Sequence, residues 1–272
     1  MEKLKLGLIA KMYNTGSEAF EKVASLGIPT CQVSLAVEDV LEERDFSSVP
    51  KMAEKNGVEI SCIFFTFRGQ YYNLKDGPAT MGLVAPAFRE ERLAMAKKFS
   101  DIVRDMGIGF VAAHIGFIPD DEKDPVYTSF IPLMREFLEH CDKNKQIFCF
   151  ETGQELPSTL KRTIKDIGME NAGINLDPAN LILYGKANPL DAVEIFGKRV
   201  KGMHAKDGIW PNRGEILGKE MPLGEGMVNF PVLLRRLKQC GYAMPVTIER
   251  EIKGPQQIED IRKAINLLEP LL

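Results

Sequence analysis

The pattern of apolar and polar residues along this chain alternates between strand-like runs and stretches with helical periodicity. Short runs rich in β-branched and aromatic residues are each followed by a stretch with helical spacing of apolar residues, and the pair repeats eight times. Most of these runs are continuously apolar, as buried parallel strands are. The predicted strands are Lys5–Met12, Thr30–Leu35, Glu59–Phe67, Gly109–Gly116, Gln146–Thr152, Gly173–Asp177, Val200–Lys206 and Pro245–Glu251. The predicted helices are Ser17–Leu26, Val49–Asn56, Phe88–Met106, Ser129–Lys143, Ser158–Ile167, Pro189–Phe196, Phe230–Cys240 and Gln256–Leu268.

Glycine marks the ends of five predicted helices. Gly27, Gly57, Gly107, Gly168 and Gly241 each follow the last periodic residue, where the left-handed cap conformation costs glycine least. Strand and helix units joined by such short turns predict a parallel sheet, and a count of eight favours a closed barrel over an open doubly wound sheet. The chain also lacks a G-x-G-x-x-G sequence after the first strand, which a dinucleotide-binding fold would carry.

The length of the chain agrees with one barrel. The sequence has 272 residues, and a barrel of eight units needs roughly 250. We therefore predict an α/β protein with a single (β/α)8 TIM barrel domain over residues 1–272. The longer connections Arg68–Ala87, Phe117–Thr128 and Asp207–Asn229 would all lie on the rim at the carboxyl ends of the strands, where barrel enzymes keep their sites.

The composition of the chain argues against several locations, partners and kinds of site. No apolar run approaches the ~20 residues that span a bilayer, and the amino terminus lacks the pattern of a secretory signal, so we expect a cytoplasmic protein. A formal net charge of −3 and the lack of basic stretches interleaved with aromatics argue against nucleic acid. The five cysteines are scattered without C-x-x-C spacing, which argues against disulfides and a thiolate zinc site.

Each of the last four predicted strands ends in a residue type that binds metals. These residues are Glu151, Asp177, His204 and Glu249. One such acid alone could be a helix cap or a surface ion-pair partner. Four groups converging on one rim would be costly to desolvate unless they shared a cation. Three carboxylates and one imidazole suit Mn²⁺ or Mg²⁺ and tolerate Co²⁺ or Zn²⁺, and we favour manganese.

The ligand on the eighth strand has two candidates. Glu251 would lie on the same face of that strand as Glu249, because side chains alternate with a period of two. Glu249 is closer to the apolar run, so we place it first.

These strand ends, together with several longer motifs, resemble the xylose isomerase-like barrels, which include sugar-phosphate isomerases and the tagatose and psicose 3-epimerases. The resemblance covers essentially the whole chain and rests on Phe150-Glu151, Leu176-Asp177-Pro178-Ala179-Asn180-Leu181, His204-Ala205-Lys206-Asp207, Leu223-Gly224-Glu225-Gly226 leading into Asn229-Phe230, and Thr247-Ile248-Glu249-Arg250-Glu251. It implies a metal site at Glu151, Asp177, His204 and Glu249. The two glutamates would also transfer protons, so the implied activity is isomerisation or epimerisation of a small sugar, keto sugar or sugar phosphate.

Four further residues are candidates for binding the substrate. His114 ends the fourth predicted strand, and Lys206 and Arg213 follow the seventh. Asn180 stands where the sugar epimerases resemble one another in having a histidine, so this chain departs from them at a position that would face the substrate. His114 and Asn180 also have a purely structural interpretation, as a core histidine and as an asparagine in a local turn.

Other functions share the same barrel. A metal-dependent lyase or dehydratase acting on a keto sugar or an inosose-like substrate would use the same first step. The apurinic endonuclease branch resembles this barrel but carries a three-zinc cluster that needs more histidines than the three present here. A non-catalytic barrel would be favoured by the loss of a ligand position, and none is lost. Barrels of this family also form dimers or tetramers, and the sequence does not fix whether this chain is a homo-oligomer.

Overall fold

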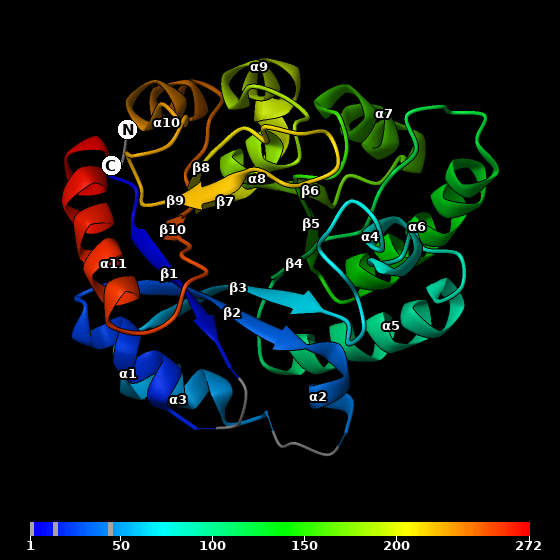
Figure 1. The fold of residues 1–272 in the computed structure, drawn as a ribbon. Coiled ribbons are helices and arrows are strands. Elements are labelled where there is room, and N and C mark those ends of the chain that lie inside the picture. The colour runs from blue at the N-terminus through cyan, green and yellow to red at the C-terminus, as the bar shows by residue number, and fades with distance from the viewer. Residues whose placement is uncertain (1–2, 13–15, 43–45) are drawn as a thin grey trace.

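The computed structural model describes residues 3–12, 16–42 and 46–272, and its centre is a closed parallel barrel. The strands neighbour one another in the order β1-β10-β7-β6-β5-β4-β3-β2, so the last barrel strand pairs with the first (Figure 1). The predicted (β/α)8 TIM barrel is confirmed. The barrel strands are β1 (Leu6–Lys11), β2 (Thr30–Ala36), β3 (Glu59–Thr66), β4 (Phe110–Ala113), β5 (Ile147–Glu151), β6 (Ala172–Leu176), β7 (Val200–Ala205) and β10 (Val246–Ile248).

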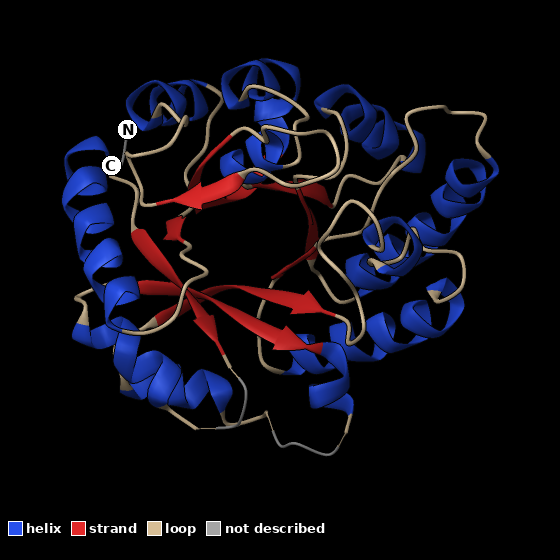
Figure 2. Ribbon diagram, in the orientation of Figure 1, coloured by secondary structure: helices blue, strands red, loops and turns tan. Residues whose placement is uncertain are grey.

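Helices surround the barrel as an outer ring (Figure 2). They are α1 (Glu18–Ser25), α2 (Val37–Leu41), α3 (Val49–Lys55), α4 (Gly77–Thr80), α5 (Arg89–Asp105), α6 (Pro125–Lys143), α7 (Pro157–Ile167), α8 (Pro178–Leu183), α9 (Pro189–Phe196), α10 (Phe230–Gln239) and α11 (Pro255–Leu268), with 3-10 turns at Gly197–Arg199 and Glu269–Leu271. The five predicted glycine caps have φ values between 69° and 89°, as left-handed caps require. No helix within the described ranges is long and apolar enough to cross a membrane.

Aromatic packing joins the outer face of the barrel to the helices. Phe65 on β3 and Phe148 on β5 have ring centroids 6.1 Å apart, and Phe137 on α6 lies 5.3 Å from Phe148. All three side chains are buried. Alternation along the strands sends these residues outward into the helix layer and leaves the intervening residues to fill the barrel interior.

The structure adds elements inside the connections that the sequence pattern treated as loops. Helices α2, α4 and α8 are short, and β8 (Asp207–Ile209) pairs with β9 (Lys219–Met221) as an antiparallel hairpin. Helix α6 begins at Pro125, before the predicted Ser129, because the Asp124 carboxylate accepts from the backbone N–H of Val126 at 2.7 Å. Strand β10 ends at Ile248, earlier than predicted, so Glu249 and Glu251 lie beyond the paired strand.

Candidate active site

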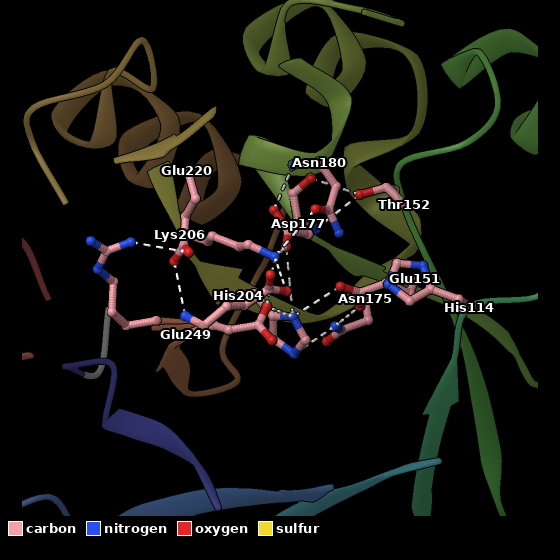
Figure 3. A network of polar contacts seen from close by, with 12 residues as sticks. His114, Glu151, Thr152, Asn175, Asp177, Asn180, His204, Lys206, Glu220 and Glu249 are labelled. Atoms are coloured by element: carbon pink, nitrogen blue, oxygen red, sulfur yellow. Dashed lines mark hydrogen bonds and ion pairs between the residues drawn. The ribbon is translucent and has the colours of Figure 1, made fainter. Parts of the chain in front are cut away.

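Four residues at the carboxyl ends of neighbouring strands converge on one point (Figure 3). Glu151, Asp177, His204 and Glu249 each offer one ligand atom, and these atoms all lie within 4.8 Å of one another. His204 Nδ1 is 2.9 Å from Glu151 Oε1 and 3.2 Å from Glu249 Oε2. The structure therefore brings together all four residues of the predicted metal site.

Two buried atoms of this cluster have no hydrogen-bond partner in the described structure. Asp177 caps helix α8 with Oδ1, which accepts from the Asn180 N–H at 2.8 Å, but its Oδ2 has no hydrogen bond and only a longer ion pair of 3.5 Å to Lys206 Nζ. His204 Nδ1 is likewise unpaired, although the Glu151 and Glu249 carboxylates lie close to it. A buried polar atom left unpaired costs about 1–3 kcal/mol. Both atoms face the same space, where a cation would satisfy them.

The raised pKa values of Asp177 and His204 also indicate that the cluster favours additional positive charge. Burial, followed by the neighbouring carboxylates, raises the pKa of Asp177 to about 7. Burial on its own lowers the pKa of His204, but the carboxylates of Glu151 and Glu249 outweigh it and raise that pKa well above its ordinary value. The cluster thus favours an added positive charge. A divalent cation fits this donor set of three carboxylates and one imidazole.

Side chains inside the barrel orient His204. Its Nε2 lies 2.8 Å from Gln32 Oε1, an oxygen that can only accept, so Nε2 carries a proton and Nδ1 is the nitrogen that would bind a metal. The Asn175 amide nitrogen, 3.0 Å from Nε2, donates instead to Glu151 Oε2. Gly202 makes room for this arrangement, because a Cβ there would lie 2.3 Å from Asn175 Oδ1.

The sequence analysis missed Gln32 and Asn175. Both are polar residues inside otherwise apolar strands, and Asn175 lies two positions before Asp177, on the same face. The signal that could have identified Asn175 is a polar residue in an apolar strand, two positions before a predicted ligand and therefore on the same face of the strand.

We predict that Gln32→Leu weakens the affinity for Mn²⁺ by about 10- to 100-fold, because the imidazole loses the acceptor that fixes its tautomer. Isothermal titration with Mn²⁺ measures this affinity. Gln239→Leu, at an exposed position of α10, is the matched control and is expected to leave it unchanged. Equal affinity in Gln32→Leu and the wild type would contradict this role.

Lys206 lies in the same cluster and is 3% exposed. Its Nζ donates to Glu251 Oε1 at 2.8 Å and to Asn180 Oδ1 at 3.3 Å, and lies 3.4 Å from Glu249 Oε2. Glu251 is therefore in contact with the site through Lys206, while Glu249 faces the metal-binding atoms directly. This geometry agrees with placing Glu249 first.

A cavity of about 520 Å³ opens above the cluster at the carboxyl ends of the strands. His114, Glu151, Asn180, Lys206, Glu249, Glu251, Tyr72 and Tyr184 line it, with apolar residues from β1 to β3 on the facing wall. Arg213 is exposed in the connection between β8 and β9 and is not part of this lining, so the structure does not bring it to the cavity. A second cavity, of about 540 Å³, lies at the opposite end of the barrel. Its lining includes none of Glu151, Asp177, His204 and Glu249, which together form the acid cluster.

Comparisons with known proteins agree with this geometry. Residues 20–271 match the model of the xylose isomerase-like TIM barrel family. The chain belongs to this family. It is 32% identical to the xylose isomerase domain protein from Planctomyces limnophilus, whose crystal structure superposes with a TM-score of 0.92 over 99% of this chain and 98% of that one.

More distant structures share the xylose isomerase-like fold. A D-psicose 3-epimerase solved in the presence of D-fructose is 16% identical, with a TM-score of 0.73 and 99% of each chain covered. A xylose isomerase-like TIM barrel protein from Mycobacterium smegmatis in complex with magnesium is 19% identical, with a TM-score of 0.72 and 100% of each chain covered. A curated relative, an uncharacterised protein of Methanocaldococcus jannaschii, is 29% identical over 118 residues, which are 40% of this chain and 38% of that protein.

The glycine-rich segment that follows the β8–β9 hairpin packs its backbone against the side chain of Asp207. Its buried carboxylate accepts from the backbone N–H groups of Gly208, Gly224, Gly226 and Val228 at distances of 2.8 to 3.1 Å. A Cβ at Gly226 would lie 2.1 Å from Asp207 Oδ1. Asp207 therefore fixes the segment that follows the hairpin, and its role is structural.

Replacing Asp207 with asparagine is expected to lower the free energy of unfolding by roughly 3 kcal/mol, because the amide cannot accept all four hydrogen bonds that the carboxylate accepts. Urea unfolding followed by circular dichroism measures the change. Asp142→Asn, at an exposed position of α6, should change stability little. A loss of similar size in both variants would refute this assignment.

Glu155, in the connection after β5, is a second residue that the sequence analysis did not single out. Its side chain is buried, and burial raises its pKa to about 8. A glutamate in the unfolded chain has a pKa of about 4.3. Between these values the unfolded chain releases a proton that the folded protein retains, so the stability that protonated Glu155 contributes is lost as the pH rises toward 8.

We predict that Glu155→Gln flattens this pH dependence. The variant and the wild type should unfold alike near pH 4, and the variant should gain stability relative to the wild type by up to about 1.4 kcal/mol per pH unit toward pH 8. Urea unfolding at pH 5, 7 and 8 follows the difference. A difference that stays constant over this range would contradict the prediction.

Proposed function

We propose that this protein is a divalent-metal-dependent isomerase or epimerase of a small sugar, keto sugar or sugar phosphate. The observation that supports this most directly is the convergence of four ligand atoms within 4.8 Å of one another, with Glu151 and Glu249 of this set lining a single cavity. The 3-epimerase among the structural neighbours shares the barrel, and family membership agrees with an enzyme acting on carbohydrate.

The proposed chemistry divides between the metal and two glutamates. Glu151, Asp177, His204 and Glu249 would hold a divalent cation, which would supply electrophilic polarisation of a substrate carbonyl group. Glu151 comes from β5 and Glu249 follows β10, so their carboxylates reach the cluster from different strands of the barrel. One carboxylate removes the proton next to the carbonyl and the other returns it. Return to the opposite face gives epimerisation, and return to the neighbouring carbon gives isomerisation.

We propose Mn²⁺ as the metal, with Mg²⁺, Co²⁺ or Zn²⁺ as replacements. Three of the four donors are carboxylates, which favour hard cations. The Mycobacterium smegmatis barrel in complex with magnesium supports a hard divalent ion in this fold. His114, Asn180 and Lys206 line the cavity and are the proposed partners of the substrate oxygens.

Proton transfer and elimination differ in the acid that each reaction needs. A dehydratase needs an acid that gives its proton to the leaving oxygen, and the ammonium group nearest Glu249 is that of Lys206. Burial lowers the pKa of Lys206, but the carboxylates of Glu249, Asp177 and Glu251 outweigh it and raise that pKa well above its ordinary value. Lys206 therefore retains its proton and suits the binding of a substrate oxygen.

Deuterium exchange tests the proposed function. Protein loaded with Mn²⁺ is incubated in D2O with free ketoses, keto acids and sugar phosphates, and mass spectrometry follows the substrate and its products. We expect deuterium at the carbon next to the carbonyl of one substrate class, together with an epimer or an isomer. Loss of water from the labelled compound would instead identify a lyase. If metal binds and no compound in the panel exchanges, the proposed function is refuted for these substrates.

A further inference from the structure

His114 lies at the mouth of the barrel in a fixed orientation. It follows β4, lines the cavity and is largely buried. The rings of Phe64 and Tyr72 pack edge-on against its imidazole, with centroids 5.7 Å and 5.4 Å away. Figure 3 shows the ring directed from β4 toward the acid cluster. The imidazole therefore has little freedom to rotate, and the position of its proton determines what it offers to the cavity.

Gln154 contacts one nitrogen of this ring. Its Nε2 lies 3.2 Å from His114 Nδ1, and the side chain of Gln154 is buried in the connection between β5 and α7. The hydroxyl of Tyr184 donates to the Tyr72 carbonyl oxygen at 3.4 Å and also interacts with Gln154. That hydroxyl has one proton, so toward Gln154 it can act only as an acceptor. This acceptor orients the NH2 group of Gln154 toward the Tyr184 hydroxyl, and the nitrogen of that group is the atom that lies 3.2 Å from His114 Nδ1.

This orientation determines the tautomer of His114. Because the amide donates to Nδ1, that nitrogen must hold a lone pair, and the ring proton must be on Nε2. An imidazolium would direct an N–H at the amide protons, so the same contact disfavours it. Burial independently lowers the pKa of His114 and so favours the neutral ring. The contact with Gln154 uses Nδ1 and His114 lines the cavity, so the Nε2–H is the donor that the ring offers to a ligand there.

We propose that Gln154 is a positioning residue that holds His114 as the neutral Nε2–H tautomer, so that His114 donates a hydrogen bond to a substrate oxygen and does not move protons. The tautomer follows from the contacts of the protein alone, and only its use toward a sugar oxygen rests on the proposed function. Proton transfer is then left to Glu151 and Glu249. A substrate must also present an oxygen to His114, because a desolvated N–H left unpaired is costly.

Nitrogen NMR tests the tautomer directly. The chain has three histidines, His114, His140 and His204, so long-range ¹H–¹⁵N spectra of protein labelled with ¹⁵N-histidine contain three ring systems. His114→Asn identifies the relevant one. At pH 7.5 we expect a protonated, pyrrole-type Nε2 and an unprotonated, pyridine-type Nδ1. A protonated Nδ1, or an imidazolium, would overturn the proposal without any need for a second variant.

Two substitutions test the part played by Gln154. Gln154→Leu removes the donor and should give signals averaged between the two tautomers. Gln154→Glu supplies an acceptor and should move the proton to Nδ1. Gln239→Leu, at an exposed position of α10, should leave the wild-type spectrum unchanged. If the His114 signals in Gln154→Leu match those of the wild type, Gln154 does not set the tautomer and the proposal fails.

The kinetic effect is separable from the proposed function. In the deuterium-exchange assay we expect Gln154→Glu to raise KM at least tenfold while kcat changes less, because the lost donor binds substrate and does not transfer the proton. A large fall in kcat at unchanged KM would show that His114 moves protons and would overturn the proposal. Failure of the proposed function would appear as no exchange in the wild type, and the NMR result would stand by itself.

Discussion

Replacing Glu249 with glutamine is expected to slow deuterium exchange into the substrate by a factor of about 100 to 10,000, the usual contribution of a general base. The substitution keeps the size of the side chain but removes its charge and its ability to accept the proton. The ammonium group of Lys206 lies 3.4 Å from its Oε2, and His204 Nδ1 lies 3.2 Å from the same atom. Burial raises the pKa of Glu249, but Lys206 and His204 outweigh it and hold that pKa well below its ordinary value, so the carboxylate is ionised.

Glu251→Gln is the matched control for this prediction. Glu251 is two residues further along the same segment, contacts Lys206, and has a side chain that is 53% exposed. Its substitution should reduce exchange far less than that of Glu249. The assay uses protein saturated with Mn²⁺, so that weaker metal binding does not mimic the loss of the base. Equal losses in the two variants would show that Glu249 has no special role.

Replacing His204 with alanine is expected to weaken Mn²⁺ binding by more than about 100-fold, which exceeds the effect of losing an outer partner such as Gln32. His204 supplies the one nitrogen donor of the set, and its Nδ1 is held toward the carboxylates by the bond from Nε2 to Gln32. A metal ion that binds the folded protein and not the unfolded chain stabilises the folded state by about 2.7 kcal/mol when the metal concentration is 100 times its Kd. The same concentration of Mn²⁺ should therefore raise the Tm of the wild type and leave that of His204→Ala nearly unchanged.

His140→Ala provides the control for metal binding. His140 lies on α6, where its Nε2 contacts Asp101 at 2.9 Å, well away from the acid cluster. This variant should respond to Mn²⁺ as the wild type does. Isothermal titration confirms the affinities without reference to stability. Retention of the Mn²⁺-induced rise in Tm by His204→Ala would exclude His204 as a ligand.

Local sequence determined the barrel and the four proposed metal ligands. Continuous apolar runs, helical spacing and glycine caps such as Gly27 and Gly107 depend on residues close together in the chain. The ligands could be predicted because all parallel strands of a barrel end at the same rim. A residue such as Asp177 at the end of an apolar run therefore faces its counterparts on the other strands.

Tertiary structure alone decided which side chains surround the site. Gln32 contacts His204 across 172 positions of sequence, and Gln154 contacts His114 across 40. Such contacts depend on how the barrel closes and on the stagger between strands, which local periodicity does not encode. The same holds for Arg213, which the hairpin β8–β9 leaves outside the cavity, and for Asp207, three of whose four backbone partners reach it only when residues 222–228 fold back against it. The sequence thus determined which chemical groups reach the rim, and the packing of the closed barrel decided their partners, their protonation and their direction.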